Sequence, residues 1–441
     1  MTEYFKILPK ELKEIISLTA HVSRETKMPA YLVGGALRDL ILGVRNFDTL
    51  ALPSIDPDQS RRIDLDIAVE GNGSIFAQSL AKKLKSELRI HERFGTATLI
   101  LDNFLKVDIA TTRKEKYPSP GCLPLVGFGQ LKDDLMRRDF TINAMAVSIV
   151  GSDTQELIDP FGGQDDLSAG RIRVLHDLSF QDDPTRILRA IRFEQRFNFR
   201  IEPKTLFLAK DAIKNGLLNK VSPHRIRDEL ILMLKESQPL KQIKRLNSLC
   251  SLSFISKKLK VEKSTNLLFK SARKEILWFR KNFPSYRQLD GWLIYFTALL
   301  TPLSLREINK ITSRLGLRRG EEKRIISYSR FNHKLIQLLS KKNVLPARIF
   351  SALEPLSYET IILLKSASGN KYLKEYITNF LEIYNGMRLY VSGKDLASFG
   401  VLPGPRYQKI FAQVLEARLN GKVNGRCGEL TLIRELIKKT N

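Results

Sequence analysis

The chain has 441 residues, of which 43% are apolar, so it is long enough for about three domains with buried cores. It contains no 18-residue apolar run and no apolar segment near its N-terminus, so we expect neither a membrane span nor a signal peptide. Its three cysteines are scattered, which argues against a disulfide framework or a zinc cluster and fits the reducing cytoplasm.

The net charge of +26 is distributed unevenly along the chain. Residues 1–170 carry 21 basic and 24 acidic side chains, whereas residues 171–441 carry the remaining 52 and 23. A surface this basic is typical of a protein that binds an anionic polymer, most often nucleic acid. The alternative is a basic surface that only keeps the protein in solution.

The first elements predict a phosphate site. Residues 31–33 are expected to form a short strand that leads into Gly34-Gly35 and a helix over 36–42. At such a junction backbone N–H groups can meet phosphate oxygens, and Arg38 would add positive charge. A glycine pair is, alternatively, only a tight turn.

Two carboxylates follow a polar loop over 44–62. Asp64 and Asp66 lie two residues apart in an apolar run, so on a strand they project to the same face, about 7 Å apart along the backbone. Like charges this close favour a cation between them, and carboxylate oxygens suit Mg²⁺. The alternative is an edge strand with a solvated acidic face.

A helix over 74–84 and two strands, 96–101 and 105–110, are expected next. Asp108 lies in the second strand, where it is either a third carboxylate near the metal pair or a strand-end charge. The segment 117–129 is so rich in Pro and Gly that we expect no regular structure there, and such loops are often mobile functional elements.

Arg138, Asp139 and Asn143 offer donors and acceptors suited to a sugar and a triphosphate. The alternative is that Asp139 caps a helix and the arginines beside it are solvated.

A further helix is expected to begin at Pro184, with Asp183 as its N-cap. Arg186, Arg189 and Arg192 recur every three residues and form one stripe along it. A bound anion would offset the mutual repulsion of these arginines.

Beyond this stripe the pattern is helical and basic. Arg273 and Lys274 lie in a segment that mixes basic and aromatic residues, while Gly393, Gly404 and Arg406 lie in glycine-cornered turns. Backbone N–H groups in such turns can bind a phosphodiester chain, so we interpret these five residues as RNA-binding.

Four motifs together resemble the class II tRNA nucleotidyltransferase and bacterial poly(A) polymerase family, within the DNA polymerase β-like nucleotidyltransferase superfamily. They occur in the family's order, as Leu32–Asp39, Asp64–Asp66, Arg137–Ala144 and Asp182–Phe193. The resemblance implies an α+β fold, in which a small polymerase β-like α/β head is followed by an all-helical neck, body and tail. The implied boundaries are 1–165 for the catalytic head, 166–240 for the neck with its base-selection motif, 241–345 for the RNA-binding body and 346–441 for the RNA-binding tail.

One departure from the family pattern concerns the spacing before the paired carboxylates. The family usually has a shorter connection than the 26 positions that separate Arg38 from Asp64. Asp48 lies nearer the usual distance but lacks a second carboxylate. We therefore keep Asp64 and Asp66 as the pair and interpret 44–62 as an insertion.

The resemblance implies that the 3′-hydroxyl of an RNA attacks the α-phosphorus of CTP or ATP and releases pyrophosphate. Asp64 and Asp66 would be the catalytic residues that hold two Mg²⁺ ions, with Asp108 as a candidate third ligand. The residues that would bind the nucleotide are Gly34, Gly35, Arg38, Arg138, Asp139, Asn143, Asp183, Arg186, Arg189 and Arg192.

Base choice follows from donors and acceptors. Asp183 only accepts hydrogen bonds and Arg186 only donates them. Cytosine and adenine both present an exocyclic NH₂ donor beside a ring-nitrogen acceptor, whereas guanine and uracil reverse that order. One Asp–Arg pair therefore fits C and A and leaves G and U with unpaired groups.

We predict a CCA-adding tRNA nucleotidyltransferase whose partners are the tRNA 3′ end and nucleoside triphosphates, with no membrane association. A CC-adding enzyme, an A-adding enzyme and a poly(A) polymerase are close alternatives, and a non-catalytic RNA-binding protein is a distant one. The sequence does not distinguish among the close alternatives, and it does not fix the oligomeric state.

Overall fold

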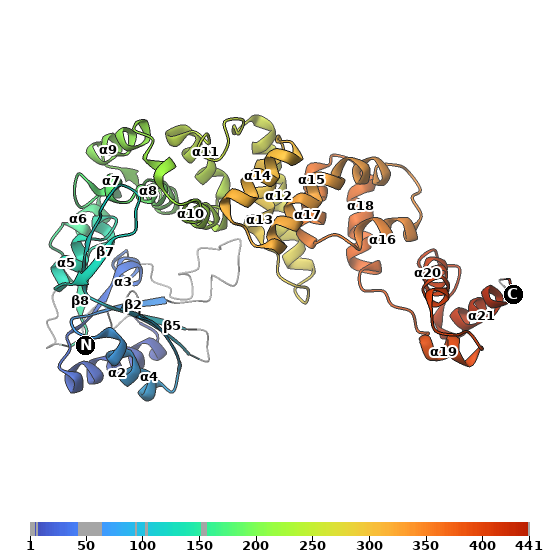
Figure 1. Ribbon diagram of the computed structural model, residues 1–441, viewed down its shortest axis with the longest axis horizontal. Helices are drawn as coiled ribbons and strands as arrows, with labels where there is room; N and C mark the ends of the chain where they lie inside the picture. Colours follow the sequence, from blue (N-terminus) through green and yellow to red (C-terminus); the bar gives the residue numbers. More distant parts are fainter. Residues whose placement is uncertain are drawn as a thin grey trace. The chain divides into compact units, whose positions relative to one another are not determined.

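The computed structural model describes residues 5, 8–42, 64–92, 95–101, 105–150 and 157–439, without the side chains of Asp64, Phe331 and Asn332. The predicted insertion 44–62, Asp48 included, lies outside these residues. The chain divides into two compact units (Figure 1). The first comprises Met1–Glu262 and Arg314–Gly316, and the second comprises Lys263–Ser313 and Leu317–Asn441.

A seven-stranded mixed sheet forms the centre of the N-terminal part of the first unit. Its strand order is β3-β4-β5-β2-β1-β8-β9, and only β2 and β5 are parallel neighbours. The strands are β1 (Ala30–Val33), β2 (Asp64–Val69), β3 (Glu87–His91), β4 (Thr96–Ile100), β5 (Lys106–Thr111), β8 (Ala146–Ser148) and β9 (Leu157–Ile158). The strands predicted at 31–33, 96–101 and 105–110 are confirmed, each within one residue at either end.

Helices cover both faces of this sheet. On one face lie α2 (Lys10–Thr26) and α4 (Gly73–Leu84), which contact each other and the strands (Figure 1). On the other face, Val33 and Ala68 of the sheet pack against Leu131 and Leu135 of α5 (Leu131–Met136). Side chains alternate along a strand, so Asp66 projects to the same face as Ala68.

The junction after β1 has the predicted form, because α3 (Gly34–Ile41) begins directly at the glycine pair. The expectation of no regular structure over 117–129 is wrong for its last residues. Residues Leu125–Phe128 form β7, which pairs antiparallel with β6 (Arg113–Lys116) in a separate hairpin. Pro124 lies just before this strand, where its missing N–H removes no ladder bond, and Val126 and Phe128 suit an extended backbone.

Helices make up most of the remainder of the first unit. They are the 3₁₀ turn η2 (Thr141–Asn143), α6 (Gly163–Ser168), α7 (Ser179–Asp182), α8 (Thr185–Phe197), α9 (Pro203–Lys214), η3 (Leu217–Lys220), α10 (Pro223–Lys235) and α11 (Pro239–Cys250). One two-stranded parallel sheet joins β10 (Arg171–Ile172) to β11 (Arg200–Ile201). After β11 the described residues contain no strand, as the sequence predicted.

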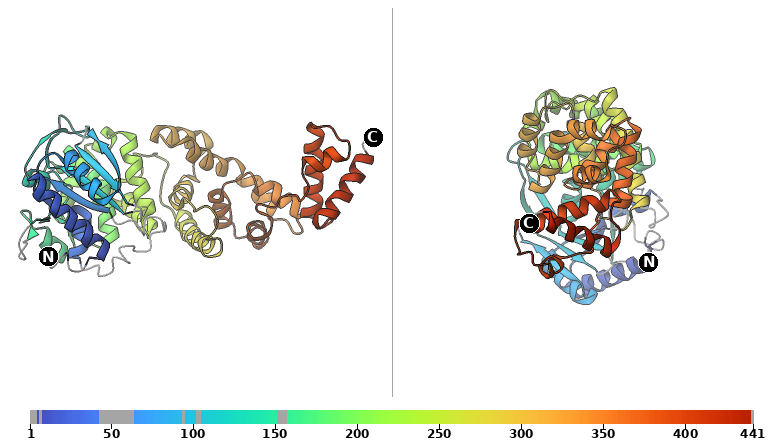
Figure 2. Two further views of the ribbon diagram at one scale, coloured as in Figure 1. Left: turned by 90° about the horizontal axis from the view of Figure 1, so that it is seen from below. Right: turned by 90° about the vertical axis from the view of Figure 1, so that its right-hand side faces the viewer.

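The second unit is helical throughout its described residues. Its elements are α12 (Lys263–Asn282), α13 (Gly291–Leu300), α14 (Leu305–Leu315, whose last residues belong to the first unit), α15 (Arg319–Leu339), α16 (Pro346–Leu353), α17 (Tyr358–Ala367), α18 (Lys371–Asn379), the π-helical turn η4 (Phe380–Tyr384), α19 (Gly393–Ser398), α20 (Pro405–Leu419) and α21 (Gly425–Lys438). The last three helices lie against one another around an apolar cluster that includes Leu396, Val414 and Ile433 (Figure 2, red). The division into head, neck, body and tail stays a prediction.

No helix among the described residues is long and apolar enough to cross a membrane.

Candidate active site

A cavity of about 940 Å³ in the first unit gathers most of the predicted site residues. Strands, the β6–β7 hairpin and the helices α3, α8 and α10 all contribute to its lining. The predicted residues among them are Gly34, Gly35, Arg38, Asp66, Asp108, Arg138, Asp139, Asn143, Asp183, Arg186, Arg189 and Arg192. Of the nucleotide and metal residues predicted, only Asp64 is not shown there, because its side chain lies outside the described part.

Asp66 and Asp108 are direct register partners on the parallel strands β2 and β5. Asp108 is therefore inside the strand and next to Asp66, as the metal interpretation requires, rather than at a strand end. The Thr98 hydroxyl donates to Asp108 Oδ1 at 2.5 Å. Within the described residues no group of three or more His, Cys, Asp or Glu side chains is placed to hold a metal, so a metal site here would have Asp66 and Asp108 as its described carboxylates.

Gly34 makes the approach of α3 to these carboxylates possible. Its φ of +71° is a conformation that side chains rarely adopt, and a Cβ there would lie 2.7 Å from Asp66 Oδ2. The same Cβ would lie 3.2 Å from Nη1 of Arg138. A glycine is therefore required where the backbone, a carboxylate and a guanidinium meet.

Arg138 is held beside Gly34 by an acidic residue of α5. Its Nη2 donates to Asp134 Oδ2 at 3.0 Å, while Arg137 donates to Asp134 Oδ1. Burial alone would raise the pKa of Asp134, but the two arginines outweigh this and lower it. The carboxylate thus stays charged and fixes both arginines at the wall of the cavity.

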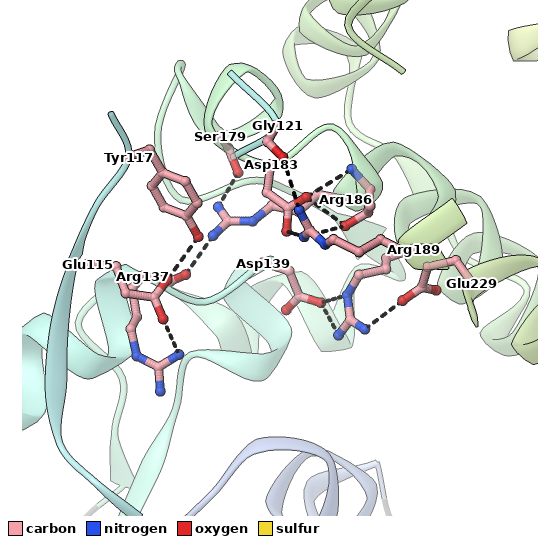
Figure 3. Close-up of polar contacts among 12 residues, drawn as sticks. Glu115, Tyr117, Gly121, Arg137, Asp139, Ser179, Asp183, Arg186, Arg189 and Glu229 are labelled. Atoms are coloured by element: carbon pink, nitrogen blue, oxygen red, sulfur yellow. Dashed lines mark hydrogen bonds and ion pairs between the residues drawn. The ribbon is translucent and has the colours of Figure 1, made fainter. Parts of the chain in front are cut away.

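A continuous series of hydrogen bonds crosses the cavity wall. Arg38 Nη1 donates to Asn143 Oδ1 at 2.7 Å, and Asn143 Nδ2 donates to Asp139 Oδ1 at 2.9 Å. Arg189 then donates to Asp139 Oδ2 and to Glu229 (Figure 3). Asp139 is 8% exposed; burial alone would raise its pKa, but Arg189 and Asn143 outweigh this and hold the pKa at about 2.

The predicted arginine stripe of α8 needs a correction. A bound anion was expected to offset the repulsion, but protein carboxylates already neutralise two of the three arginines. Arg189 pairs with Asp139 and Glu229, and Arg192 pairs with Glu229 and Glu236. The sequence did not reveal these partners because the two glutamates lie on or beside α10, far along the chain.

The helix that follows Asp183 begins at Thr185, one residue later than predicted, so its N-cap is Pro184 and not Asp183. Residues Ser179–Asp182 form their own short helix α7, so the chain passes through an extended Asp183 before α8 starts. Asp183 Oδ1 accepts the backbone N–H of Thr185 at 3.0 Å and its hydroxyl at 2.6 Å. Asp183 therefore lines the cavity and also contributes to capping.

Arg186 is 4% exposed, so its side chain is buried and does not face solvent. Its Nη1 donates to Ser179 Oγ and its Nη2 to the carbonyl oxygen of Arg137, both at 2.7 Å (Figure 3). Both acceptors are uncharged, in contrast to those of Arg189.

Sequence reasoning missed several residues of the cavity. Glu115 accepts hydrogen bonds from Arg113, from Arg137 and, at 2.8 Å, from the Tyr117 hydroxyl. Arg113 and Glu115 lie on one face of β6, and Tyr117 follows the strand directly at the same spacing. This alternation could have been recognised in the sequence. Arg225 of α10 donates to Asp183 Oδ2 at 2.5 Å, and no local pattern marks it.

The predicted RNA-binding residues all lie in the second unit. Arg273 and Lys274 are exposed on α12, Gly393 begins α19, and Gly404 and Arg406 lie at the start of α20. Their role in binding RNA stays a prediction.

Two protein families match parts of the chain. The family described as "Poly A polymerase head domain" matches residues 30–173, which include the β1–α3 junction and both carboxylate strands. The family described as "Probable RNA and SrmB- binding site of polymerase A" matches residues 198–255.

The match to similar proteins extends over almost the whole chain. An A-adding tRNA nucleotidyltransferase of Geobacter sulfurreducens is 35% identical over 96% of this chain, which spans 47% of that longer protein. An A-adding tRNA nucleotidyltransferase of Halalkalibacterium halodurans is 30% identical over 96% of this chain and 92% of its own length. The structure of the Thermotoga maritima CCA-adding enzyme complexed with tRNA has a TM-score of 0.71 and 31% identity, covering 99% of this chain and 98% of that one.

The likeness to these enzymes therefore extends over nearly the full length and includes the sheet, the glycine junction and the helices that line the cavity. The chain belongs to the family of tRNA nucleotidyltransferases that carry a poly(A) polymerase head domain.

Proposed function

We propose that this chain adds C and A from CTP and ATP to the 3′ end of tRNA in the cytoplasm, completing the CCA sequence and releasing pyrophosphate. One observation carries the proposal: a single cavity holds the Asp66–Asp108 pair together with Asp183 and Arg186. Carboxylates suited to phosphoryl transfer thus lie in the same space as a donor and an acceptor suited to reading a base.

The hydrogen bonds of Asp183 support a role in base reading. A carboxylate has about four lone-pair positions. Asp183 Oδ1 accepts two bonds from Thr185, and Oδ2 accepts one from Arg225. About one position therefore remains, which suits the exocyclic NH₂ of cytosine or adenine.

Arg186 supplies the complementary donors. Two of its five N–H groups are held by Ser179 and by the Arg137 carbonyl, so about three remain for a ligand. A ring nitrogen that accepts a hydrogen bond lies beside the NH₂ group in both C and A. In U and G an N–H lies at that place instead and would face an arginine donor, which costs ~1–3 kcal/mol as an unpaired group.

The carboxylate pair fits a divalent cation. Asp66 and Asp108 are register partners, both line the cavity, and their oxygens are ligands that Mg²⁺ prefers. Mg²⁺ held by Asp66 and Asp108, with Asp64 as a further predicted ligand, would neutralise charge on the pyrophosphate and favour the deprotonated 3′-hydroxyl. Gly34 has no side chain that would clash with the Asp66 carboxylate, so the carboxylate side of the cavity stays open.

The phosphates would lie at the start of α3. Gly34 and Gly35 expose backbone there, and Arg38 and Arg138 line the same cavity. Arg38 is fixed by Asp39 and Asn143 and lies over the ring of Phe197, with 4.6 Å from its guanidinium carbon to the ring centroid. These fixed positions orient the triphosphate without further reorganisation.

Addition of the terminal A alone is a second candidate, and a specific observation favours it. The two relatives described above, each matching 96% of the chain, are named A-adding tRNA nucleotidyltransferases. The pocket chemistry fits C and A equally, so it does not separate the two candidates.

The test uses the purified full chain with tRNA that ends before CCA, tRNA that ends in CC, and an unrelated RNA. Products made with CTP, ATP or both are then sequenced. Addition of CCA to the first substrate is the expected result. Extension of only the CC-ended tRNA would contradict the proposal and indicate an A-adding enzyme. Long A tails on the unrelated RNA would contradict it and indicate a poly(A) polymerase.

A further inference from the structure

Ser179 contacts both residues proposed to read the base. Its hydroxyl accepts a hydrogen bond from Arg186 Nη1 at 2.7 Å, and its carbonyl oxygen accepts the backbone N–H of Asp183 at 3.1 Å. Ser179 is fully buried at the first position of α7, four residues before Asp183. Ser179 thus connects the proposed base acceptor Asp183, through its backbone, with the proposed base donor Arg186, through its hydroxyl.

The hydroxyl is one of two anchors of the Arg186 guanidinium. The other is the Arg137 carbonyl, which accepts from Nη2 (Figure 3). A planar guanidinium bound at both terminal nitrogens has a fixed orientation, whereas one bound at a single nitrogen can rotate about that bond. The direction of the remaining N–H groups therefore depends on Ser179.

The chemistry of these anchors also matters for charge. A hydroxyl and a carbonyl orient Arg186 without neutralising it, whereas carboxylates neutralise Arg189 and Arg192 on the same helix. Arg186 keeps its positive charge available to a ligand, and Ser179 provides direction only.

We propose that Ser179 is a positioning residue for base selection, which holds the Arg186 guanidinium in the orientation that accepts C and A and rejects U and G. The inference rests on the proposed function, because it assumes that Arg186 reads the base. Ser179 itself does not touch the nucleotide.

Two substitutions of Ser179 separate the effect of losing the hydroxyl from the effect of losing side-chain volume. Ser179→Ala removes the acceptor and leaves a small void, whereas Ser179→Cys keeps nearly the same volume with a much weaker acceptor. Thr205→Val is a matched control, because Thr205 is equally buried and uses its hydroxyl to accept the Val174 N–H, away from the cavity.

The measurement is kcat/KM for each of the four nucleoside triphosphates on the tRNA that the wild-type chain extends, with a melting curve for every variant. Both Ser179 variants are expected to lower the ratio of C or A use to U or G use about tenfold, the size of a lost hydrogen bond to a charged group. Thr205→Val should shift the melting temperature and leave that ratio unchanged.

Unchanged ratios in a folded Ser179→Cys or Ser179→Ala variant would overturn the positioning role while leaving the proposed function intact. A ratio that falls equally in Thr205→Val would overturn it as well, because a general loss of packing would then explain the result. A wild-type chain without any preference for C and A would instead refute base reading by this cavity.

Discussion

Arg225 on α10 donates from Nη2 to Oδ2 of Asp183 at 2.5 Å, although the two residues lie 42 positions apart. The same nitrogen also donates to the Thr185 hydroxyl at 3.2 Å. The carboxylate proposed to read the base is therefore held from two sides, by the start of α8, which follows it, and by α10. This arrangement fixes where its remaining lone pair points.

Asp183→Ala should relax selection against UTP and GTP more than it slows the use of CTP. The expected loss of preference is ~1–3 kcal/mol, the cost of a buried polar group left unpaired. Because Asp183 also accepts the Thr185 N–H, about 1 kcal/mol of stability should be lost in addition. Steady-state rates with four nucleotides, measured beside a melting curve, separate the two effects. A lowered melting point with unchanged nucleotide ratios would show that Asp183 only stabilises the start of α8 and does not read the base.

Asp66→Asn and Asp64→Asn should each abolish nucleotide addition and leave tRNA binding nearly unchanged. The reason is that the carboxylates serve the chemistry, while RNA affinity is expected from the basic second unit. Rates of addition and tRNA dissociation constants are measured on the same preparations. If either variant adds nucleotides at a near wild-type rate, the assignment of that aspartate as a metal ligand is wrong. If Asp48→Asn abolishes activity instead, the metal ligands lie in the segment 44–62.

Asp139 should make the protein sensitive to acid. Its pKa of about 2 lies below the ordinary value of 3.8, so it stabilises the folded state above about pH 4, and this stabilisation is lost as the pH falls towards 2. The shift corresponds to about 2 kcal/mol. Urea unfolding between pH 6 and 2 should show a shallower decrease for Asp139→Asn than for the wild type. Parallel curves for the two proteins would contradict the assigned ion pair with Arg189.

Arg273→Glu with Lys274→Glu should weaken tRNA binding and reduce its salt dependence. For every phosphate that the variant no longer neutralises, the slope of log affinity against log salt should become shallower by about 0.7–0.9. Turnover at saturating tRNA should not change. Lys10→Glu with Lys82→Glu, a charge change of the same size on exposed positions of the first unit, is the control. Equal weakening by both pairs would indicate a general charge effect rather than RNA binding at α12.

Much of the site could be predicted because its residues lie in short local patterns. Alternation in β2 and β5 placed Asp66 and Asp108 on strands, and the glycine pair marked the start of α3. These signals depend on neighbouring residues alone, so one sequence is sufficient to read them. The family resemblance then indicated which of them meet in space.

Long-range partners could not be predicted in the same way. Glu229 and Arg225 lie on α10, and their hydrogen bonds with Arg189 and Asp183 depend on how α8 and α10 pack. The strand β7 was missed because Pro and Gly outweighed a short apolar run whose pairing with β6 only the fold provides. Tertiary pairing thus decided the features that local propensity left open.

The most direct test of base selection is the incorporation of each of the four nucleoside triphosphates, supplied singly, into tRNA ending before CCA and into tRNA ending in CC. The purified chain is expected to incorporate CTP or ATP and to discriminate against UTP and GTP by a factor on the order of 10⁴. Comparable incorporation of UTP or GTP on either tRNA would contradict it.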